Sequence, residues 1–320
     1  MKAKVVSIFI SMLLNCMLTS ASNLDELHIL VPGPAGGGWD ITARTVGTAL
    51  VNNNIIKSIT FTNYVGAGGW RGFQAFTKNS EFKFSVMIQS SPIIYRKVFG
   101  VYNKGFSDLR PLVALLGEYE AVITRGNSPY KSIREIVHKI QKNPHRNPVV
   151  LGSSKGSIDH IAALIILKAA GVDNLNELRF IFREGDSNAI NTLLEGSGIV
   201  MFSGYSGALL DLTKKNKLTI LAVSSRKKIE GVEIDTLYEQ GINIEFVNWR
   251  GFFVRKDLMD QRFAIYEKAL LDLTKSDEWK KILKNNGWTS MVMNSKEFDE
   301  FLRAQHKEAL KIFSEFGLKF

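Results

Sequence analysis

Short apolar runs alternate with helical stretches along almost the whole chain, and the apolar runs end in small polar turns. Residues 28–31 lead through a proline and glycine turn into a helical pattern that begins at Asp40. Residues 59–63 end in a second glycine turn, and residues 84–89 end at Ser90 and Ser91. Strands that alternate with helices are typical of α/β folds with mainly parallel sheets. The alternation therefore predicts an α/β protein.

The second half of the chain repeats the plan of the first. Strand candidates at residues 149–152, 180–182 and 199–202 each lead through a turn of glycine, serine or acidic residues into a helix. In open α/β sheets, ligands bind beyond the carboxyl ends of the strands, which is where such turns lie. We therefore expect two lobes, each a mainly parallel sheet flanked by helices.

Two apolar stretches have the character of crossings between these lobes. The pattern of residues 112–124 predicts a strand with an interruption at residues 117–119, and residues 242–254 predict a strand-rich return. Two crossings imply a hinge. We place one lobe at residues 23–118 together with residues 249–320, and the other lobe at residues 119–248.

The first 22 residues differ in composition from the rest of the chain. A basic start is followed by a mostly apolar run at residues 5–18 and then by small residues. This order is typical of a secretory signal peptide, so we expect cleavage near Ala21 or Ser22. An uncleaved anchor is disfavoured because the run is shorter than the roughly 20 residues that span a membrane. A lipoprotein would use Cys16, but the bulky Asn15 precedes that cysteine.

Composition excludes several kinds of function. Cys16 is the only cysteine, so a chain cleaved beyond it has no disulfide, thiolate metal site or cysteine nucleophile. The histidines form no HxH or HExxH pattern, so we expect neither a metal nor another cofactor. The net charge of +10 comes from scattered lysines and arginines, which is typical of solvated surfaces and not of nucleic-acid binding.

The glycine turns form the candidate binding site. The three glycines at residues 36–38 lack a Cβ, so a ligand can lie against the backbone. They precede a helix, whose unsatisfied N–H groups and dipole favour an anion. The turn lacks the Gly-Lys-Ser/Thr end of a nucleotide P-loop. Similar turns at residues 66–69, 153–157 and 185–188 give each half two of them, which predicts an anion held between two closing lobes.

Side chains near these turns complete the candidate set. Asp40 and Asp186 begin helices, where each either caps the helix or contacts the ligand. Trp249 either walls the site or packs in the core. The candidate ligand-binding residues are Ala35, Gly36, Gly37, Gly38, Trp39, Asp40, Gly66, Ala67, Gly68, Gly69, Gln89, Ser90, Ser91, Ser153, Ser154, Ser157, Gly185, Asp186, Tyr205 and Trp249.

One motif also fits an enzyme. Residues 152–156 match G-x-S-x-G between a strand and a helix, which would make Ser154 a nucleophile. A serine hydrolase also needs an acid and a histidine. His160 follows too closely for the usual order, and His306 belongs to an amphipathic terminal helix. A helix start that binds an anion needs the same small residues, so we expect no catalytic residue and keep a serine hydrolase as the alternative.

Five segments together resemble the substrate-binding proteins of tripartite tricarboxylate transporters. They are VPGPAGGGWDITAR, VGAGGWRG, LGSSKGSIDHIAA, FREGDSNAINTLLEG and the run from LAVSSRKKIEG to NWRGFFV. The resemblance covers the mature chain in order, and PAGGGWD and NWRGFF resemble the tricarboxylate-type branch. Two segments depart from the family pattern: REGDSNA, and Val65-Gly66-Ala67 in place of proline-glycine-alanine.

This resemblance implies a two-lobed periplasmic-binding-protein fold, type II-like, that closes like a Venus flytrap. It implies a monomeric periplasmic receptor, not an enzyme, for a di- or tricarboxylate such as citrate. The acid is bound largely by backbone N–H groups and water in the first-lobe turns, and is delivered to one large and one small membrane subunit. A sensor that docks on a signalling receptor is the alternative to transport.

Overall fold

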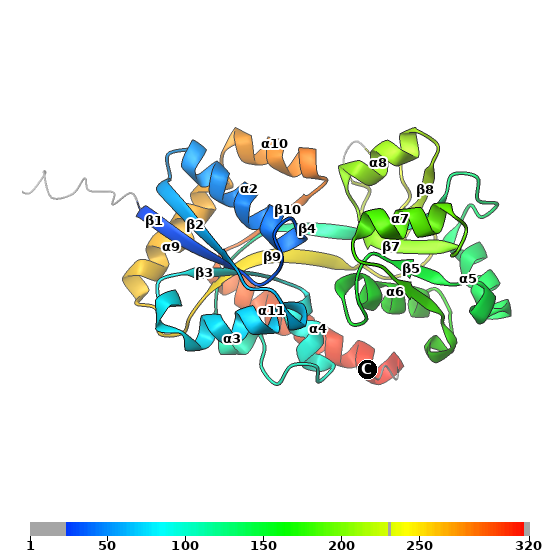
Figure 1. Ribbon diagram of the computed structural model, residues 1–320, viewed down its shortest axis with the longest axis horizontal. Coiled ribbons are helices and arrows are strands. Elements are labelled where there is room, and N and C mark those ends of the chain that lie inside the picture. The colour runs from blue at the N-terminus through cyan, green and yellow to red at the C-terminus, as the bar shows by residue number, and fades with distance from the viewer. Residues whose placement is uncertain (1–23, 230–231, 317–320) are drawn as a thin grey trace, which may run out of the picture.

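The computed structural model describes residues 24–229 and 232–316, so the expected signal peptide at residues 1–22 lies outside the described residues. Two lobes lie side by side along the long axis of the molecule, and two long strands run from one to the other (Figure 1). Within the described part of the chain, no helix is both long and apolar enough to cross a membrane.

The first lobe is built on three parallel strands. Its elements are β1 (Leu24–Val31), α2 (Gly38–Asn52), β2 (Ile56–Asn63), α3 (Trp70–Lys78), β3 (Val86–Ser90) and α4 (Pro92–Val98). β1 lies in the middle, with Leu30 opposite both Thr62 of β2 and Met87 of β3. Helices cover both faces of this sheet, so Ile29 and Leu30 on successive positions are both fully buried.

The second lobe contains a matching parallel set. Its elements are α5 (Ile133–Lys142), β5 (Val149–Leu151), α6 (Ile158–Ala169), β6 (Phe180–Phe182), α7 (Asp186–Leu194), β7 (Val200–Gly204), α8 (Gly207–Lys214) and β8 (Leu218–Val223). β5 pairs in parallel with both β6 and β7, so Val150 lies opposite Ile181 and Met201. The carboxyl ends of these strands therefore meet at one edge.

Two antiparallel strands join the lobes. They are β4 (Arg110–Arg125) and β9 (Val247–Val254). The first half of β4 also pairs with β10 (Thr289–Met293), and its second half pairs with β7 and β8. The expected interruption at residues 117–119 is wrong, because these residues pair with residues 247–249 of β9. A Cβ on Gly117 would lie 2.6 Å from Val247 Cγ2, so a glycine allows the close approach of β9 there.

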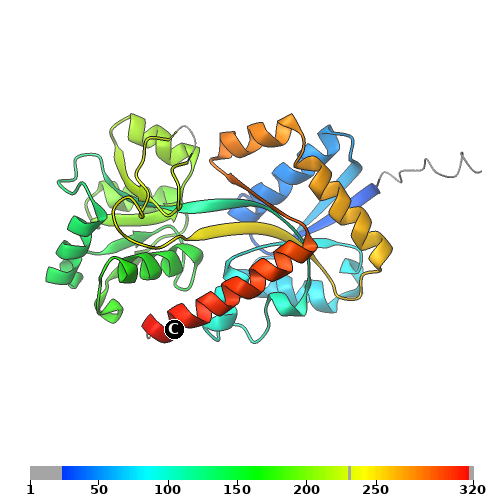
Figure 2. The same ribbon diagram turned by 180° about the vertical axis from the view of Figure 1, so that it is seen from behind.

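The crossing strands make the whole sheet mixed. Each lobe keeps the expected parallel set, but β4 is antiparallel to all of its partners. The return segment expected from residue 242 is a strand only from Val247. β9 returns the chain to the first lobe, and three helices pack there: α9 lies beside α2, and α11 runs along α4 and β4 (Figure 2). They are α9 (Asp260–Leu273), α10 (Asp277–Asn286) and α11 (Ser295–Phe316).

Candidate functional site

One face of the continuous sheet carries charged residues where the chain passes between the lobes. Cα register pairs Ser90 with Arg250, Asn248 with Glu118, and Glu120 with Gly204. Paired residues share a face of a sheet, and so do residues two apart on one strand. We call this surface the junction face; it consists of Ser90, Glu118, Glu120, Gly204, Asn248 and Arg250.

An ion pair lies at the centre of the junction face. Arg250 Nη2 donates to Glu118 Oε2 at 2.7 Å, and the two side chains are 9% and 15% exposed. A Cβ on Gly38 would lie 2.7 Å from Arg250 Nη1, and one on Gly204 would lie 2.8 Å from Glu118 Cδ. The pair therefore connects the first glycine turn with the end of a second-lobe strand. The prediction from sequence missed both residues, although a charge inside an apolar strand was the available signal.

Asp40 organises the first glycine turn. Its carboxylate accepts hydrogen bonds from Gly36 N–H at 2.9 Å, Arg44 Nε at 2.9 Å and Asn63 Nδ2 at 3.0 Å. Burial works to raise the pKa of Asp40, but these hydrogen bonds hold it below its ordinary value. The N–H group of Gly37 donates to a carbonyl within the turn. The expectation that the turn's N–H groups are unsatisfied is therefore wrong for Gly36 and Gly37.

The second first-lobe turn packs against the first. Gly66, Gly68 and Gly69 have φ angles of 127°, 60° and 100°, a region that residues with side chains rarely adopt. A Cβ on Gly69 would lie 3.0 Å from the ring of Trp39, whose Nε1 donates to Ser90 Oγ at 2.9 Å. The structure thus brings both predicted turns together beside Ser90. Ala35, Ala67 and Gly68 are exposed there, whereas Gln89 is buried beneath.

Serine and acidic side chains occupy the second-lobe turns. Ser153 Oγ donates to Asp159 and lies 2.6 Å from Ser157 Oγ. The Gly185 N–H group donates to the carbonyl of Gly152 at 2.9 Å, which ties the turn after β6 to the turn after β5. The structure therefore brings the two predicted second-lobe turns together. The Asp186 carboxyl lies beside Gly152, where an added Cβ would clash with its Oδ1.

Carboxyl groups gather where these turns meet the crossing strands. Glu120 is 1% exposed, and within residues 24–229 and 232–316 its Oε2 has no hydrogen-bond partner. Burial raises the pKa of Glu120, and the charges of Asp159, Glu118 and Asp186 raise it further. Burial also raises the pKa of Asp159 to about 7, despite the hydrogen bond from Ser153. We call Glu118, Glu120, Asp159 and Asp186 the acidic cluster.

Comparison with known proteins identifies the family. The family described as "Tripartite tricarboxylate transporter family receptor" matches residues 43–318, which is most of the chain. The chain belongs to this receptor family. A comparison with curated proteins gives no match.

Solved structures share the fold of this receptor. The periplasmic binding protein BugD has a TM-score of 0.76 at 19% identity, covering 92% of this chain and 98% of BugD. MatC from Rhodopseudomonas palustris with bound malate has a TM-score of 0.74 at 15% identity, covering 90% and 98%. R. palustris Rpa4515 with adipate has a TM-score of 0.78 at 18% identity, covering 92% and 98%. The fold is therefore the α/β periplasmic-binding-protein fold, as expected.

The serine hydrolase alternative is wrong, because the chain belongs to a family of solute receptors and not of enzymes. The site agrees with this. Ser154 is exposed, whereas His160 is buried and its Nδ1 accepts a hydrogen bond from Gly156 N–H at 3.0 Å. Burial, with a smaller effect from Lys155, lowers the pKa of His160 to about 4. The residues at 152–156 serve a helix start in this receptor.

Three predicted residues of the receptor pack away from the junction face. Trp249 is fully buried, and its Nε1 donates to Gln305 of α11. Successive residues of a strand face opposite sides, so Arg250 and not Trp249 lies on the junction face. Ser91 is also fully buried and donates to the carbonyl of Val247 at 3.0 Å. Tyr205 belongs to the second-lobe core. All three side chains are buried in the interior of the protein.

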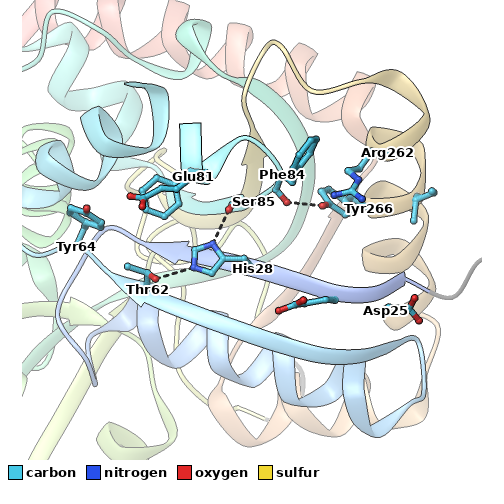
Figure 3. Close-up of a pocket in the computed structure, with 12 residues that line it drawn as sticks. Asp25, His28, Thr62, Tyr64, Glu81, Phe84, Ser85, Arg262 and Tyr266 are labelled. Carbon is cyan, nitrogen blue, oxygen red and sulfur yellow. Dashed lines mark hydrogen bonds between the residues drawn. The ribbon is translucent and has the colours of Figure 1, made fainter. Parts of the chain in front are cut away.

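The receptor also has a cavity of about 820 Å³ within the first lobe, shown in Figure 3. There the ring nitrogens of His28 lie 2.8 Å from Ser85 Oγ and 2.9 Å from Thr62 Oγ1. Burial lowers the pKa of His28, although Glu81 and Glu26 act to raise it. The lining residues come from β1, β2, the segment before β3 and α9, which all belong to one lobe. Closure of two lobes would not reshape this cavity, so the junction face remains the candidate site.

Proposed function

We propose that this receptor binds a small di- or tricarboxylate, such as citrate, at the junction of its lobes. Arg250 is the observation that carries the proposal. Its guanidinium lies beside Gly38 at the N-terminus of α2, so a carboxylate there would meet both a positive charge and helix N–H donors. Charge-assisted hydrogen bonds of this kind are the strong ones in proteins.

Two relatives support a carboxylate as the ligand. MatC carries malate and Rpa4515 carries adipate, and both molecules are dicarboxylates. At 15% and 18% identity to this chain, they support the class of ligand and not its length. Malate, citrate and adipate are therefore the first acids to test.

The receptor acts by closing its lobes on the acid and delivering it to the large and small membrane subunits of a transporter. We assign residues 23–118 with 249–320 to one lobe and residues 119–248 to the other, with β4 and β9 as the hinge. The segment at residues 1–22 is proposed to direct the chain to the periplasm, where it acts as a monomer. The acid requires no cofactor to bind.

Thermal unfolding and calorimetry of purified protein, freed of retained ligand, test the proposal. A ligand that binds only the folded protein stabilises it by about 2.7 kcal/mol at a concentration of 100 times Kd. We expect at least one of the three acids to raise Tm and to release heat on binding. Arg250→Gln should remove most of this response, and Arg303→Gln, on the exposed side of α11, should keep it. A panel that gives neither a Tm shift nor heat contradicts the proposal.

A further inference from the structure

The strand β6 ends the sheet on the second-lobe side. In the order β2-β1-β3-β9-β4-β7-β5-β6, it pairs with β5 and with no other strand of the described residues. The strands β5 and β7 separate it from the crossing strands β4 and β9. An edge strand offers backbone groups to another chain unless the fold covers them. We call the outer side of residues 179–183 the β6 edge.

Alternate residues direct their backbone groups to the β6 edge. The carbonyl of Arg179 and the N–H group of Arg183 form hydrogen bonds of 2.9 and 3.0 Å with β5. Because backbone groups along a strand alternate in direction, Phe180 and Phe182 present their N–H and C=O groups to the outside. Among the described residues, one of these four groups has a partner, since Arg183 Nη1 donates to the Phe182 carbonyl at 3.0 Å. The other three are open to another chain.

Side chains on one face of this strand form a basic, apolar, basic stripe. Arg179, Ile181 and Arg183 are two apart, so they share a face, and all three line a cavity of about 650 Å³. Both arginines are exposed, and Arg183 Nε donates to a threonine hydroxyl of α7 at 2.8 Å. In the part of the chain that the structure describes, neither forms an ion pair, although Glu177 and Glu184 are close in sequence. The stripe therefore has positive charge to offer.

We propose that the β6 edge binds an extended segment of a partner protein as an additional strand. The segment carries two acidic residues four apart, with an apolar residue midway between them. Hydrogen bonds to the backbone of Phe180 and Phe182 supply affinity, as in other cases of strand addition. Opposite charges directly across a strand pair are favourable, so the acidic residues lie across from Arg179 and Arg183 and the apolar one across from Ile181. This goes beyond the proposed function, which names membrane subunits and assigns them no surface.

A second copy of this chain fits the β6 edge poorly. Two copies paired antiparallel about Ile181 would place Arg179 of each across from Arg183 of the other. Like charges directly opposite one another destabilise a strand pair. The net charge of +10 adds repulsion between copies, whereas it attracts an acidic partner.

Blocked heptapeptides and the purified receptor test the proposal. The probe is Thr-Glu-Thr-Val-Thr-Glu-Thr, and its counterpart has lysine in place of both glutamates. In NMR titrations, the acidic peptide should shift the amide signals of Phe180 and Phe182. It should slow their hydrogen exchange about tenfold at roughly ten times its Kd. The lysine peptide should bind roughly tenfold more weakly or less, because two attractive pairs become repulsive.

Methylated peptides test the backbone contact. Only alternate N–H groups of a strand face its neighbour. Of two acidic peptides methylated on alternate nitrogens, in the two possible settings, one should therefore lose binding and the other should keep it.

Charge exchange in the receptor locates the contact. Arg179→Gln and Arg183→Gln should each weaken binding of the acidic peptide about two- to fivefold. Arg179→Glu combined with Arg183→Glu should reverse the preference, so that the lysine peptide binds more tightly. Lys139→Gln, exposed on α5 of the same lobe, is the matched control and should alter neither affinity.

The outcomes separate docking from ligand binding. Preference for the acidic peptide, reversed by charge exchange, supports the added strand. The proposal is overturned if the signals of Phe180 and Phe182 do not shift, if both charge types bind equally, or if both methylated peptides do. The same variants should bind malate, citrate and adipate as the unmodified receptor does, because β5 and β7 separate β6 from the crossing strands. Failure of every acid to bind contradicts the proposed function alone.

Discussion

The two lobes bring carboxyl groups of opposite character to the same junction. In the first lobe, Asp40 accepts hydrogen bonds from a backbone N–H, an arginine and an asparagine, and its pKa lies below the ordinary value. In the second lobe, Asp159 accepts a hydroxyl hydrogen bond but faces other carboxyl groups, and its pKa rises to about 7. Both residues lie in the first turn of a helix that follows a parallel strand. The groups around each carboxyl, and not its position in the fold, therefore set its pKa.

The two sets of carboxyl groups also differ in whether they already have hydrogen-bond partners. The carboxylate of Asp40 has its partners without a ligand, because it accepts hydrogen bonds from Gly36 N–H, Arg44 and Asn63. The carboxyl groups of the acidic cluster repel one another. Within the described residues, Glu120 Oε2 has no hydrogen-bond partner. In the proposed function, a carboxylate contacts Arg250 and the N-terminus of α2, whereas the second-lobe cluster contains a carboxyl oxygen that has no partner within the described residues.

Arg250→Met is expected to have the largest effect on stability, because it removes the positive charge at the centre of the junction face. It leaves Glu118 largely buried without its partner and beside three further carboxyl groups. We expect the free energy of unfolding to fall by about 3–5 kcal/mol in urea titrations at neutral pH.

The control for this variant is Arg303→Met. Arg303 forms an ion pair with Asp299 on the exposed side of α11. Breaking such a surface pair should cost less than about 1 kcal/mol. Glu118→Gln should also cost less than Arg250→Met, because it lowers the repulsion on Glu120. Equal losses in Arg250→Met and Arg303→Met would contradict the central place of this ion pair.

The architecture could be predicted from the sequence because it depends on local patterns. Strand, turn and helix each leave a period or a composition in the chain, so the parallel sets of both lobes were expected within a few residues. The crossing strand β4 was interrupted in the prediction at Gly117 and Glu118, since glycine and charge normally end strands. In the structure, β9 and β10 pair on either side of this stretch and override the local preference. The sequence prediction contains neither the helix α4 nor the strand β10.

The candidate site could be predicted only in part. Glycine and serine turns are visible in the sequence, and the structure brings the predicted turns of each lobe together. Arg250 and Glu118 are distant in the chain, and only the pairing of β4 with β9 makes them neighbours. The prediction includes Trp249 and omits Arg250, because the register that decides which residue faces the junction is a tertiary property. Charge coupling within the acidic cluster likewise depends on segments that no local pattern relates.

The pH dependence of stability tests the raised pKa of Asp159 in the second lobe. The pKa of Asp159 in the folded protein, about 7, lies above the ordinary aspartate value of about 3.9 in an unfolded chain, so the folded protein binds an extra proton between these two pH values. This group therefore destabilises the fold as pH rises through that window, by a few kcal/mol in order of magnitude. Asp159→Asn should gain stability relative to the unmodified protein at about pH 7.5 compared with about pH 5. Urea unfolding at both values measures it, and a constant difference would count against the prediction.

Asp40→Asn should show the opposite slope in the first lobe. The pKa of Asp40 is lowered on folding, so its stabilisation is present above the unfolded pKa and is lost as pH falls through the folded pKa. We expect a loss of about 1–2 kcal/mol at neutral pH, which shrinks in strong acid. Thermal unfolding of both proteins across this range is the measurement. A loss that grows as pH falls would show that Asp40 and Asp159 do not differ as the contacts indicate.

The smallest expected effect separates two serines of one second-lobe turn. Ser157 caps α6 by accepting a hydrogen bond from His160 N–H and lies 2.6 Å from Ser153 Oγ, whereas Ser154 is exposed. Ser157→Ala should therefore cost about 1 kcal/mol, and Ser154→Ala less than about 0.5 kcal/mol. Ser154→Ala should also keep its affinity for carboxylates, and the unmodified protein should resist a serine-directed hydrolase probe. If Ser154→Ala proved the more damaging change, the turn would have a role beyond beginning a helix.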